Sequence, residues 1–249
     1  MLTRWLVTGA EGLLGQDLVR VLAARRLDTL ALYRRELDVT DRGAVHAAVR
    51  AVRPAIVVNC AAWTDVDAAE RQAGRARAVN TDGARHVAEA CAATGAVLLH
   101  PSTDYVFAGT ATAPYPETAP TEPRTVYGRT KLDGEQAVLR TLPERGHVVR
   151  TAWLYGAHGP NFVRTVIERE ARLATLDVVD DQYGQPTWTV ELAGLLVRLG
   201  EAAARGVAPP GVYHATASGT TTWYGLAREV FRLLGRDPDR VRRTTTAAL

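Results

Sequence analysis

The chain has 249 residues, of which 47% are hydrophobic, and a formal net charge of +3. This length fits one α/β domain or a large domain with a small appended lobe. Basic residues are mostly dispersed among acidic ones, which gives little support to nucleic-acid binding. No apolar run reaches membrane length, and the N-terminal residues are typical of a strand rather than a signal peptide, so we predict a cytoplasmic protein without a membrane segment.

The use of cysteine and histidine argues against a metal centre or a disulfide. Cys60 and Cys91 lie at a predicted strand end and within a predicted helix, where buried, reduced thiols are expected. The six histidines form no close pair of ligands. We therefore expect no bound metal ion.

Apolar runs of strand length alternate with segments of helical periodicity, which is typical of a parallel sheet covered on both faces. The expected strands span residues 4–8, 28–33, 55–60, 96–101 and 147–152. The expected helices between them span residues 14–26, 41–52, 72–94 and 126–141. Beyond residue 155 the pattern is less regular, with helices expected at 161–172, 188–204 and 222–235 and short strands at 176–180 and 211–215.

This alternation predicts an α/β fold, a Rossmann-type doubly wound parallel sheet with a smaller C-terminal substrate lobe. The dinucleotide-binding domain is expected to comprise residues 1–155 and about 186–210. The lobe is expected to comprise about 156–185 and 211–249.

Three glycines follow the first predicted strand. Gly9, Gly12 and Gly15 lie in the sequence G-A-E-G-L-L-G, which opens the first predicted helix. Such glycines allow a tight turn, a close approach to a pyrophosphate and close packing of helix on sheet, with the phosphates at the positive end of the helix. Three glycines can also form an ordinary turn, but the strand-turn-helix position favours a dinucleotide site.

The end of the second strand bears on the choice of dinucleotide. An NAD site carries an acid about 20 residues beyond the glycine turn, whereas an arginine there accommodates the 2'-phosphate of NADP. This chain has Arg34 and Arg35 at that place, so we predict a preference for NADPH. NADH stays an alternative, because Glu36 and Asp38 are close in the sequence.

Polar residues follow three of the predicted strands, at the sheet edge where open α/β sheets bind ligands. The segments are N-C-A-A-W-T-D-V-D from Asn59, H-P-S-T-D-Y-V-F from His100 and R-T-A-W-L-Y-G from Arg150. Turn and capping chemistry could account for one such cluster, but three clusters beside a dinucleotide turn favour a site. A loop with four prolines at residues 108–124 follows the second cluster, and long loops at strand ends commonly carry function.

Tyr127 and Lys131 are four residues apart in a predicted helix, so their side chains share one face. A tyrosine keeps its proton until about pH 10. A nearby ammonium group lowers that pKa and makes the hydroxyl a usable proton donor or acceptor. An exposed surface pair is the alternative at this spacing, but the glycine turn favours acid catalysis beside a redox cofactor.

Across almost the whole chain, these motifs resemble the dTDP-4-dehydrorhamnose reductases, a branch of the extended short-chain dehydrogenase/reductase superfamily. Besides the glycine turn, the resemblance rests on V-V-N-C-A-A-W-T-D-V-D-A-A-E ending at Glu70, S-T-D-Y-V-F-A-G from Ser102, V-Y-G-R-T-K-L-D-G-E ending at Glu135, R-T-A-W-L-Y-G from Arg150, D-Q-Y-G-Q-P-T from Asp181 and G-V-Y-H-A-T-A-S-G-T-T-T-W from Gly211. The D-Q-Y-G-Q-P-T segment is not a general nucleotide-binding signature, so the resemblance identifies more than a superfamily.

The resemblance implies reduction, with NADPH, of the C4 ketone of a nucleotide-linked 4-keto-6-deoxysugar. Tyr127 would protonate the forming alkoxide, Lys131 would bind the nicotinamide ribose and hold down the pKa of Tyr127, and Thr103 would hydrogen-bond the carbonyl oxygen. Cofactor binding is expected from Gly9, Glu11, Gly12, Leu13, Leu14, Gly15, Arg34, Arg35, Asp38, Val39, Ala61, Ala62, Trp63, Ser102, Tyr127 and Lys131. Substrate binding is expected from Val66, Thr103, Asp104, Tyr105, Tyr127, Trp153, Asn161 and Gln185. For Trp153 packing is the alternative, because tryptophans bury well and the chain has five of them.

The chain departs from the pattern of the family at three places. Glu11 puts an acid inside the glycine turn, near the expected pyrophosphate, and Leu13 replaces a common glutamine. The family usually continues with a segment containing Arg-Pro, whereas this sequence stops at Thr244–Leu249. Either a tail is missing from the sequence or the substrate pocket is incomplete.

Two other interpretations stay open. A non-catalytic regulatory subunit could keep the fold and bind NADP, although intact Thr103, Tyr127 and Lys131 argue against it. A nucleotide-sugar epimerase or dehydratase is a nearer alternative, because Asp104 keeps dehydration chemically open. The resemblance also leaves open whether the sugar serves rhamnose or a specialised-metabolite sugar such as dihydrostreptose, and it allows a homodimer.

Overall fold

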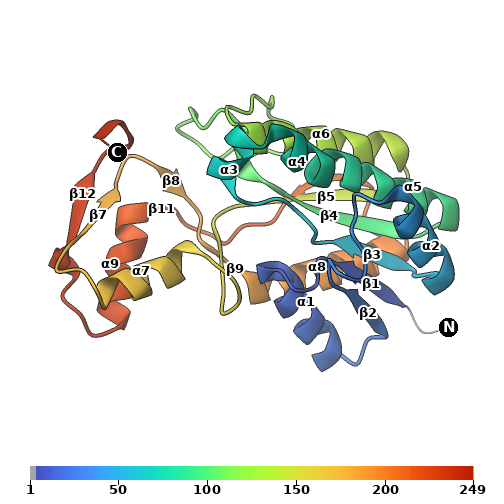
Figure 1. The fold of residues 1–249 in the computed structure, drawn as a ribbon, viewed down its shortest axis with the longest axis horizontal. Helices are drawn as coiled ribbons and strands as arrows, with labels where there is room; N and C mark the ends of the chain where they lie inside the picture. Colours follow the sequence, from blue (N-terminus) through green and yellow to red (C-terminus); the bar gives the residue numbers. More distant parts are fainter. Residues whose placement is uncertain (1–3, 249) are drawn as a thin grey trace.

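The computed structural model describes residues 4–248, and a six-stranded parallel sheet forms its centre (Figure 1). The strands are β1 (Trp5–Thr8), β2 (Thr29–Leu32), β3 (Ile56–Asn59), β4 (Val97–Thr103), β5 (Gly146–Thr151) and β10 (Gly211–His214). They are ordered β10-β5-β4-β3-β1-β2 and all pair in parallel. The chain winds outward in both directions from β1 and β3, which confirms the predicted doubly wound class and puts the ligand crevice at that junction.

Helices cover both faces of the sheet. One face carries α1 (Leu13–Ala24) and α8 (Thr189–Ala204), and the other carries α2 (Arg42–Val52), α5 (Ala84–Thr94) and α6 (Val126–Thr141) (Figure 1). Because both faces are covered, β1 and β3 are buried along their whole length. The predicted helix at residues 126–141 has the bounds of α6.

The predicted helix at residues 72–94 is one helical run with a change of winding inside it. It comprises α4 (Ala73–Arg77), a π-helical stretch η1 (Ala78–Gly83) and α5. A short helix, α3 (Val66–Arg71), precedes this run and was not expected. Its start is fixed by Asp65, whose Oδ1 accepts a hydrogen bond from Ala68 N over 2.9 Å.

The C-terminal lobe has its own small core. It contains α7 (Phe162–Glu170), α9 (Trp223–Leu233), β7 (Leu176–Val179) and β12 (Val241–Thr244), the last two paired in parallel. Its buried residues are Val166, Leu176, Val178, Ala227, Val230, Phe231 and Val241. In Figure 1 these elements lie to one side of the central sheet, as the predicted smaller lobe requires. The strand β12 was not expected from the sequence.

Short elements complete the structure. Two small sheets pair β6 (Leu154–Tyr155) with β9 (Thr187–Trp188) and β8 (Tyr183–Gly184) with β11 (Thr221–Thr222). In Figure 1, β8 and β11 lie beside the elements of the lobe. Residues 4–248 also contain three short 3₁₀ turns: η2 (Asp104–Val106), η3 (Pro238–Arg240) and η4 (Thr246–Ala248).

The division into two domains remains a prediction, with one boundary moved by the pairing of strands. Residues 211–249 were assigned to the lobe, but β10 pairs with β5 in the central sheet from Gly211 to His214. The strand itself was expected, and only its sheet was misplaced. Residues 1–3 and 249, which the predicted division includes, lie outside the described residues.

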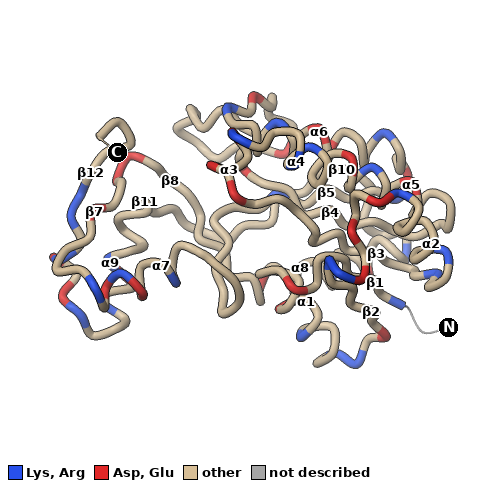
Figure 2. Tube along the Cα trace, in the orientation of Figure 1, with Lys and Arg blue, Asp and Glu red and all other residues tan. Residues whose placement is uncertain are grey.

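Charged residues of both signs are interspersed over the sheet domain and the lobe (Figure 2). Within residues 4–248, no helix is both long enough and apolar enough to cross a lipid bilayer.

Candidate active site

The three predicted catalytic side chains come from two elements at the carboxyl edge of the sheet. Thr103 is the last residue of β4. Tyr127 and Lys131 lie one helical turn apart near the start of α6. Thr103 and Lys131 are buried, and Tyr127 is partly buried. Thr103 and Tyr127 are 24 positions apart in the sequence. The fold therefore brings together residues that are distant along the chain.

The start of α6 is set by a cap that places Tyr127 in the first helical turn. Thr125 Oγ1 accepts a hydrogen bond from Gly128 N over 3.0 Å. The ring of Tyr105 meets the ring of Tyr127 edge to face, with 5.5 Å between the ring centroids. The phenol of Tyr127 is thus held between its own helix and the residues that follow β4.

Burial raises the pKa of Tyr127 well above its usual value of about 10, and the charges of Asp104 and Tyr105 act in the same direction. The Thr103 hydroxyl opposes this shift through hydrogen bonding. The expectation that Lys131 holds the pKa of Tyr127 down is therefore wrong for this structure, because desolvation of the phenolate outweighs the other effects. Tyr127 is a protonated phenol at neutral pH, the form that an acid catalyst needs.

Lys131 is the only lysine in the chain. Its Nζ donates a hydrogen bond to the carbonyl oxygen of Pro101 over 2.7 Å. Burial lowers the pKa of Lys131 to about 8, while the negative charges of Glu135 and of an ionised Cys60 would raise it. The side chain therefore titrates close to physiological pH rather than above pH 10.

The hydroxyl of Thr103 both donates and accepts a hydrogen bond within the protein. Its Oγ1 donates to Asp104 Oδ1 over 3.0 Å and accepts from Tyr105 N over 3.2 Å. Burial raises the pKa of Asp104 to about 6. A hydroxyl has one proton, so a hydrogen bond from Thr103 to a substrate carbonyl requires that proton to leave Asp104.

The glycine turn lies against the end of β3. Gly9 has a φ of +61°, and a Cβ on it would come within 2.6 Å of Ala61 N. A Cβ on Gly15 would come within 2.4 Å of the Gly9 carbonyl oxygen. Side chains at either position would therefore separate β1, α1 and the segment after β3, which together form one wall of a pocket.

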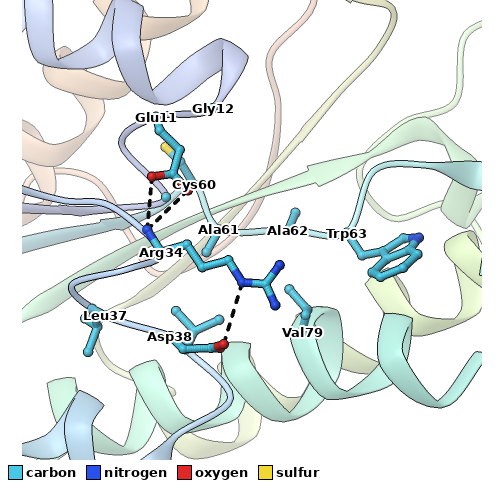
Figure 3. Close-up of a pocket in the computed structure, with 12 residues that line it drawn as sticks. Glu11, Gly12, Arg34, Leu37, Asp38, Cys60, Ala61, Ala62, Trp63 and Val79 are labelled. Carbon is cyan, nitrogen blue, oxygen red and sulfur yellow. Dashed lines mark hydrogen bonds and ion pairs between the residues drawn. The ribbon is translucent and has the colours of Figure 1, made fainter. Parts of the chain in front are cut away.

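That pocket has a volume of about 150 Å³ and lies at the β1/β3 junction (Figure 3). It contains nine of the predicted cofactor residues: Gly9, Glu11, Gly12, Arg34, Asp38, Val39, Ala61, Ala62 and Trp63. Leu37, Cys60 and Val79 also line it and were not predicted. Cys60 is only partly exposed, whereas Cys91 is buried, and both thiols are free. Leu37 and Val79 are apolar residues of ordinary type, so the sequence carried no signal for them.

Arg34 and Glu11, which both line this pocket, contact each other. The Glu11 carboxylate accepts two hydrogen bonds from Arg34 N, over 3.2 and 3.1 Å, and Arg34 Nε lies 3.6 Å from Asp38 Oδ2 (Figure 3). Glu11 therefore points toward the segment after β2 and not into the place expected for the pyrophosphate. Arg35 does not line the pocket, and its Nη2 lies 3.9 Å from Glu36.

Asn80 is a site-supporting residue that the sequence did not single out. Its Oδ1 accepts from Trp63 N over 2.8 Å, and its Nδ2 donates to Trp63 O and to Thr130 Oγ1, each over 3.1 Å. Asn80 lies in the π-helical stretch η1, and such stretches are frequent at functional sites. It ties the cofactor wall to α6 at the residue next to Lys131.

Seven of the predicted cofactor residues do not line the pocket: Leu13, Leu14, Gly15, Arg35, Ser102, Tyr127 and Lys131. The Leu14 side chain is part of the core between α1 and α8. Leu13 begins α1 and is partly buried. The Ser102 hydroxyl is buried and donates to Glu135 Oε1 over 2.5 Å. A cofactor could contact Leu13 and Leu14 through their backbone N–H groups. The hydroxyl proton of Ser102, in contrast, is already donated to Glu135.

Trp153 belongs to an aromatic stack between the sheet domain and the lobe. Its ring lies parallel to that of Trp223 on α9, with 3.4 Å between centroids. Gly184 packs against the same indole, since a Cβ there would come within 2.2 Å of Trp153 Cε2. With φ at +47°, Trp153 has a left-handed backbone that is rare for a bulky residue. Packing against the lobe is therefore its role in this structure.

The polar groups of Asn161 and Gln185 are used within the protein. Asn161 caps α7 and also donates to Gly156 O over 2.9 Å. Gln185 donates to Ala217 O and accepts from Thr216 Oγ1, each over 3.1 Å. Their contact with a substrate stays a prediction. It requires that these side chains replace their hydrogen bonds within the protein by hydrogen bonds to the substrate.

Val66 is the first residue of α3 and is partly buried. Its predicted contact with the substrate also stays a prediction. In the described part of the chain, no group of three or more His, Cys, Asp or Glu side chains is arranged to hold a metal ion.

Residues 3–249 match the model of a protein family described as the RmlD substrate binding domain. Two curated relatives come from streptomycetes. The dTDP-4-dehydrorhamnose reductase of Streptomyces griseus is 60% identical over 246 residues, which cover 99% of this chain and 81% of that protein. The dTDP-4-keto-6-deoxy-D-glucose reductase of Streptomyces niveus is 53% identical, over 97% of this chain and 82% of that protein.

A solved structure agrees with these sequence matches. The dTDP-4-dehydrorhamnose reductase of Bacillus anthracis, crystallised in complex with NADP, superposes with a TM-score of 0.93 at 35% identity. The match covers 99% of this chain and 86% of that one.

Proposed function

The chain belongs to the RmlD substrate binding domain family, that of the dTDP-4-dehydrorhamnose reductases, and we propose that it reduces the C4 ketone of a dTDP-4-keto-6-deoxysugar with NADPH. The observation that carries this function is the position of Thr103, Tyr127 and Lys131. They meet at the carboxyl edge of the sheet, beside the pocket of the glycine turn. The names of the relatives and the NADP in the Bacillus structure support the substrate class and the cofactor.

The residues of the pocket fit a dinucleotide. Among the described side chains none caps the start of α1, so the N–H groups of its first turn are available to phosphate oxygens. A Cβ on Gly12 would meet only the Gly9 carbonyl oxygen, at 3.3 Å, which leaves the backbone at this point open to a ligand. Arg34 lines the pocket, where it can pair with a 2'-phosphate.

When bound, the reduced nicotinamide supplies a hydride, which adds to C4 of the sugar. Tyr127 Oη donates its proton to the oxygen that C4 carries, so the ketone becomes a hydroxyl and the phenolate regains its proton from solvent. The raised pKa of Tyr127 keeps this proton in place until the alkoxide begins to form. Thr103 holds the carbonyl oxygen through its hydroxyl and stabilises the developing negative charge.

Lys131 contributes a donor and a charge close to Tyr127. We propose that its ammonium group, which is bound to Pro101 O in this structure, also binds the ribose hydroxyls of the cofactor.

Two further statements belong to this proposal. The active protein is a homodimer, which sedimentation analysis at several protein concentrations would check. It works in the cytoplasm, which fractionation of the source cells would check.

The direct test of the proposed function is NADPH oxidation with dTDP-4-keto-6-deoxysugars as substrates. NMR of the product establishes that C4 carries a hydroxyl and gives its stereochemistry, which separates a rhamnose-type product from its C4 epimer. A folded preparation that binds NADPH but turns over none of these sugars would favour a regulatory subunit instead.

A further inference from the structure

A buried ion pair lies directly behind the catalytic residues. The Glu135 carboxylate accepts from Arg150 Nη2 over 2.7 Å, from Arg150 Nε over 3.0 and 3.2 Å, and from Ser102 Oγ over 2.5 Å. Both ionic side chains are at least nine-tenths buried, at 2% and 7% exposed. A buried ion pair is weak evidence for stability, because taking two charges out of water offsets their attraction.

The partners of Glu135 belong to the two chain segments that carry the catalytic groups. Ser102 immediately precedes Thr103 on β4. Glu135 follows Lys131 by one turn of α6, and it follows Tyr127 by two turns on the same face. The hydrogen bond from Ser102 to Glu135 thus joins the strand end that bears the hydroxyl to the helix that bears the phenol and the ammonium.

Arg150 extends the same cluster to the proline-rich loop between these two segments. Its guanidinium lies over the ring of Phe107, 5.1 Å from the centroid, and its Nη1 donates to Glu117 O over 3.4 Å. The Phe107 ring stacks on Tyr115 with 4.3 Å between centroids. Strand, loop and helix therefore meet at one arginine and one glutamate.

We propose that Glu135 is a positioning residue for the reduction, acting through Ser102 on β4 and Lys131 on α6. This inference rests on the proposed function of the site. It goes beyond that function in assigning Glu135 and Arg150 the task of fixing the distance between Thr103 and the two groups on α6. Reactions of this kind lose about a hundredfold in rate when reacting groups move by about 1 Å.

The charge of Glu135 also acts on Lys131. Glu135 raises the pKa of that lysine against the opposing effect of burial. The other ionisable groups facing Lys131 are Tyr127 on its own helix, Cys60 after β3 and His100 on β4. Replacing the carboxylate by an amide leaves Arg150 unpaired next to them, so the pKa of Lys131 should fall further.

The single lysine makes this effect directly measurable. Selective labelling with [¹³C,¹⁵N]lysine gives one side-chain signal, whose pH titration reports Lys131 without any substrate. In Glu135→Gln the midpoint should move down by about one pH unit or more. In the same variant kcat should fall about tenfold or more while the Kd of NADPH stays within about threefold.

Two further variants separate geometry, charge and stability. Ser102→Ala keeps the charge of Glu135 but removes the bond to β4, so kcat should fall while the Lys131 midpoint stays in place. Val138→Ala is the matched control, because Val138 is buried on α6 one turn beyond Glu135 and outside the cluster. It should lower the melting temperature without moving the midpoint or kcat, with activity measured well below melting.

The proposal is overturned if Glu135→Gln matches Val138→Ala, losing thermal stability while keeping the wild-type lysine midpoint and kcat. If Glu135→Gln fails to fold, Ser102→Ala decides, and a wild-type kcat in that variant overturns the proposal. Failure of the proposed function looks different, because the wild-type protein itself then shows no turnover while the lysine titration can still be compared between variants.

Discussion

Lys131 Nζ donates a hydrogen bond to the carbonyl oxygen of Pro101, over 2.7 Å. Pro101 lies within β4, a central strand, where a proline would normally cost a ladder hydrogen bond. The pairing of β3 with β4 ends at Val58 and Leu99, so Pro101 lies beyond the last paired residue on that side. Its missing N–H therefore breaks no bond to β3, and its carbonyl is free to hold the lysine.

This environment predicts how activity depends on pH. The pKa of Lys131 is lowered to about 8, so the ammonium group loses its proton as pH rises through about 8. The value of kcat/KM, which reports groups of the free enzyme, should fall on the alkaline side with a midpoint near 8. NMR titration of the single lysine should give the same midpoint, and a profile that stays flat through pH 8 would contradict this role.

Thr103 allows a test of the hydroxyl alone. Thr103→Val keeps the shape of the side chain but removes the donor to the carbonyl oxygen, so kcat should fall by about 10²- to 10³-fold. Thr103→Ser keeps the hydroxyl and should stay within about tenfold of wild type. Equal losses in both variants, measured by NADPH oxidation, would show that packing rather than the hydroxyl matters.

Arg34 and Arg35 form a matched pair for cofactor choice. Arg34 lines the pocket and Arg35 does not. Arg34→Ala should therefore lower the ratio of kcat/KM for NADPH to kcat/KM for NADH by about tenfold or more, which corresponds to the loss of one hydrogen bond to a charged group. Arg35→Ala should leave the ratio within about twofold. The two steady-state titrations check this, and an unchanged ratio in Arg34→Ala would refute the assignment.

Gly15 tests the packing of the glycine turn. A Cβ at Gly15 would meet the Gly9 carbonyl at 2.4 Å, so Gly15→Ala should lower the free energy of unfolding by about 1–3 kcal/mol and weaken NADPH binding. Gly74→Ala is the control on α4, where a Cβ meets nothing within 4 Å, and it should raise stability by about 0.5–1 kcal/mol. Urea unfolding checks both. A Gly15→Ala protein as stable as wild type would mean that the turn adjusts easily.

The sheet and its helices could be predicted because local signals agreed with the final packing. The helix α6 has the predicted bounds because Thr125 caps it and its buried face recurs with helical periodicity. The strand β12 was missed because V-R-R-T carries two exposed arginines and has only Val241 fully buried. The π-helical winding around Asn80 could not be predicted from the sequence either. Asn80 forms hydrogen bonds with Trp63 and Thr130, which come close to it only in the folded chain.

The candidate site was predictable in its members more than in its electrostatics. Motif spacing identified the glycine turn and the pair on α6, but it could not show which of the two arginines after β2 faces the pocket. The pKa of Tyr127 was placed too low because sequence spacing reports a neighbouring charge and does not report burial. The role proposed for Glu135 was likewise invisible, since Glu135 lies on α6 and its partner Arg150 lies on β5, and only the folded chain brings them together.

The central claim is that Tyr127 donates the proton in an NADPH-dependent reduction of a dTDP-4-keto-6-deoxysugar. The most direct test compares NADPH oxidation by the wild-type and Tyr127→Phe proteins, together with their Kd for NADPH. We predict turnover by the wild type and a loss of about 10²- to 10⁴-fold in kcat for Tyr127→Phe, with nearly unchanged NADPH binding. A Tyr127→Phe protein that reduces the sugar at the wild-type rate would contradict the account.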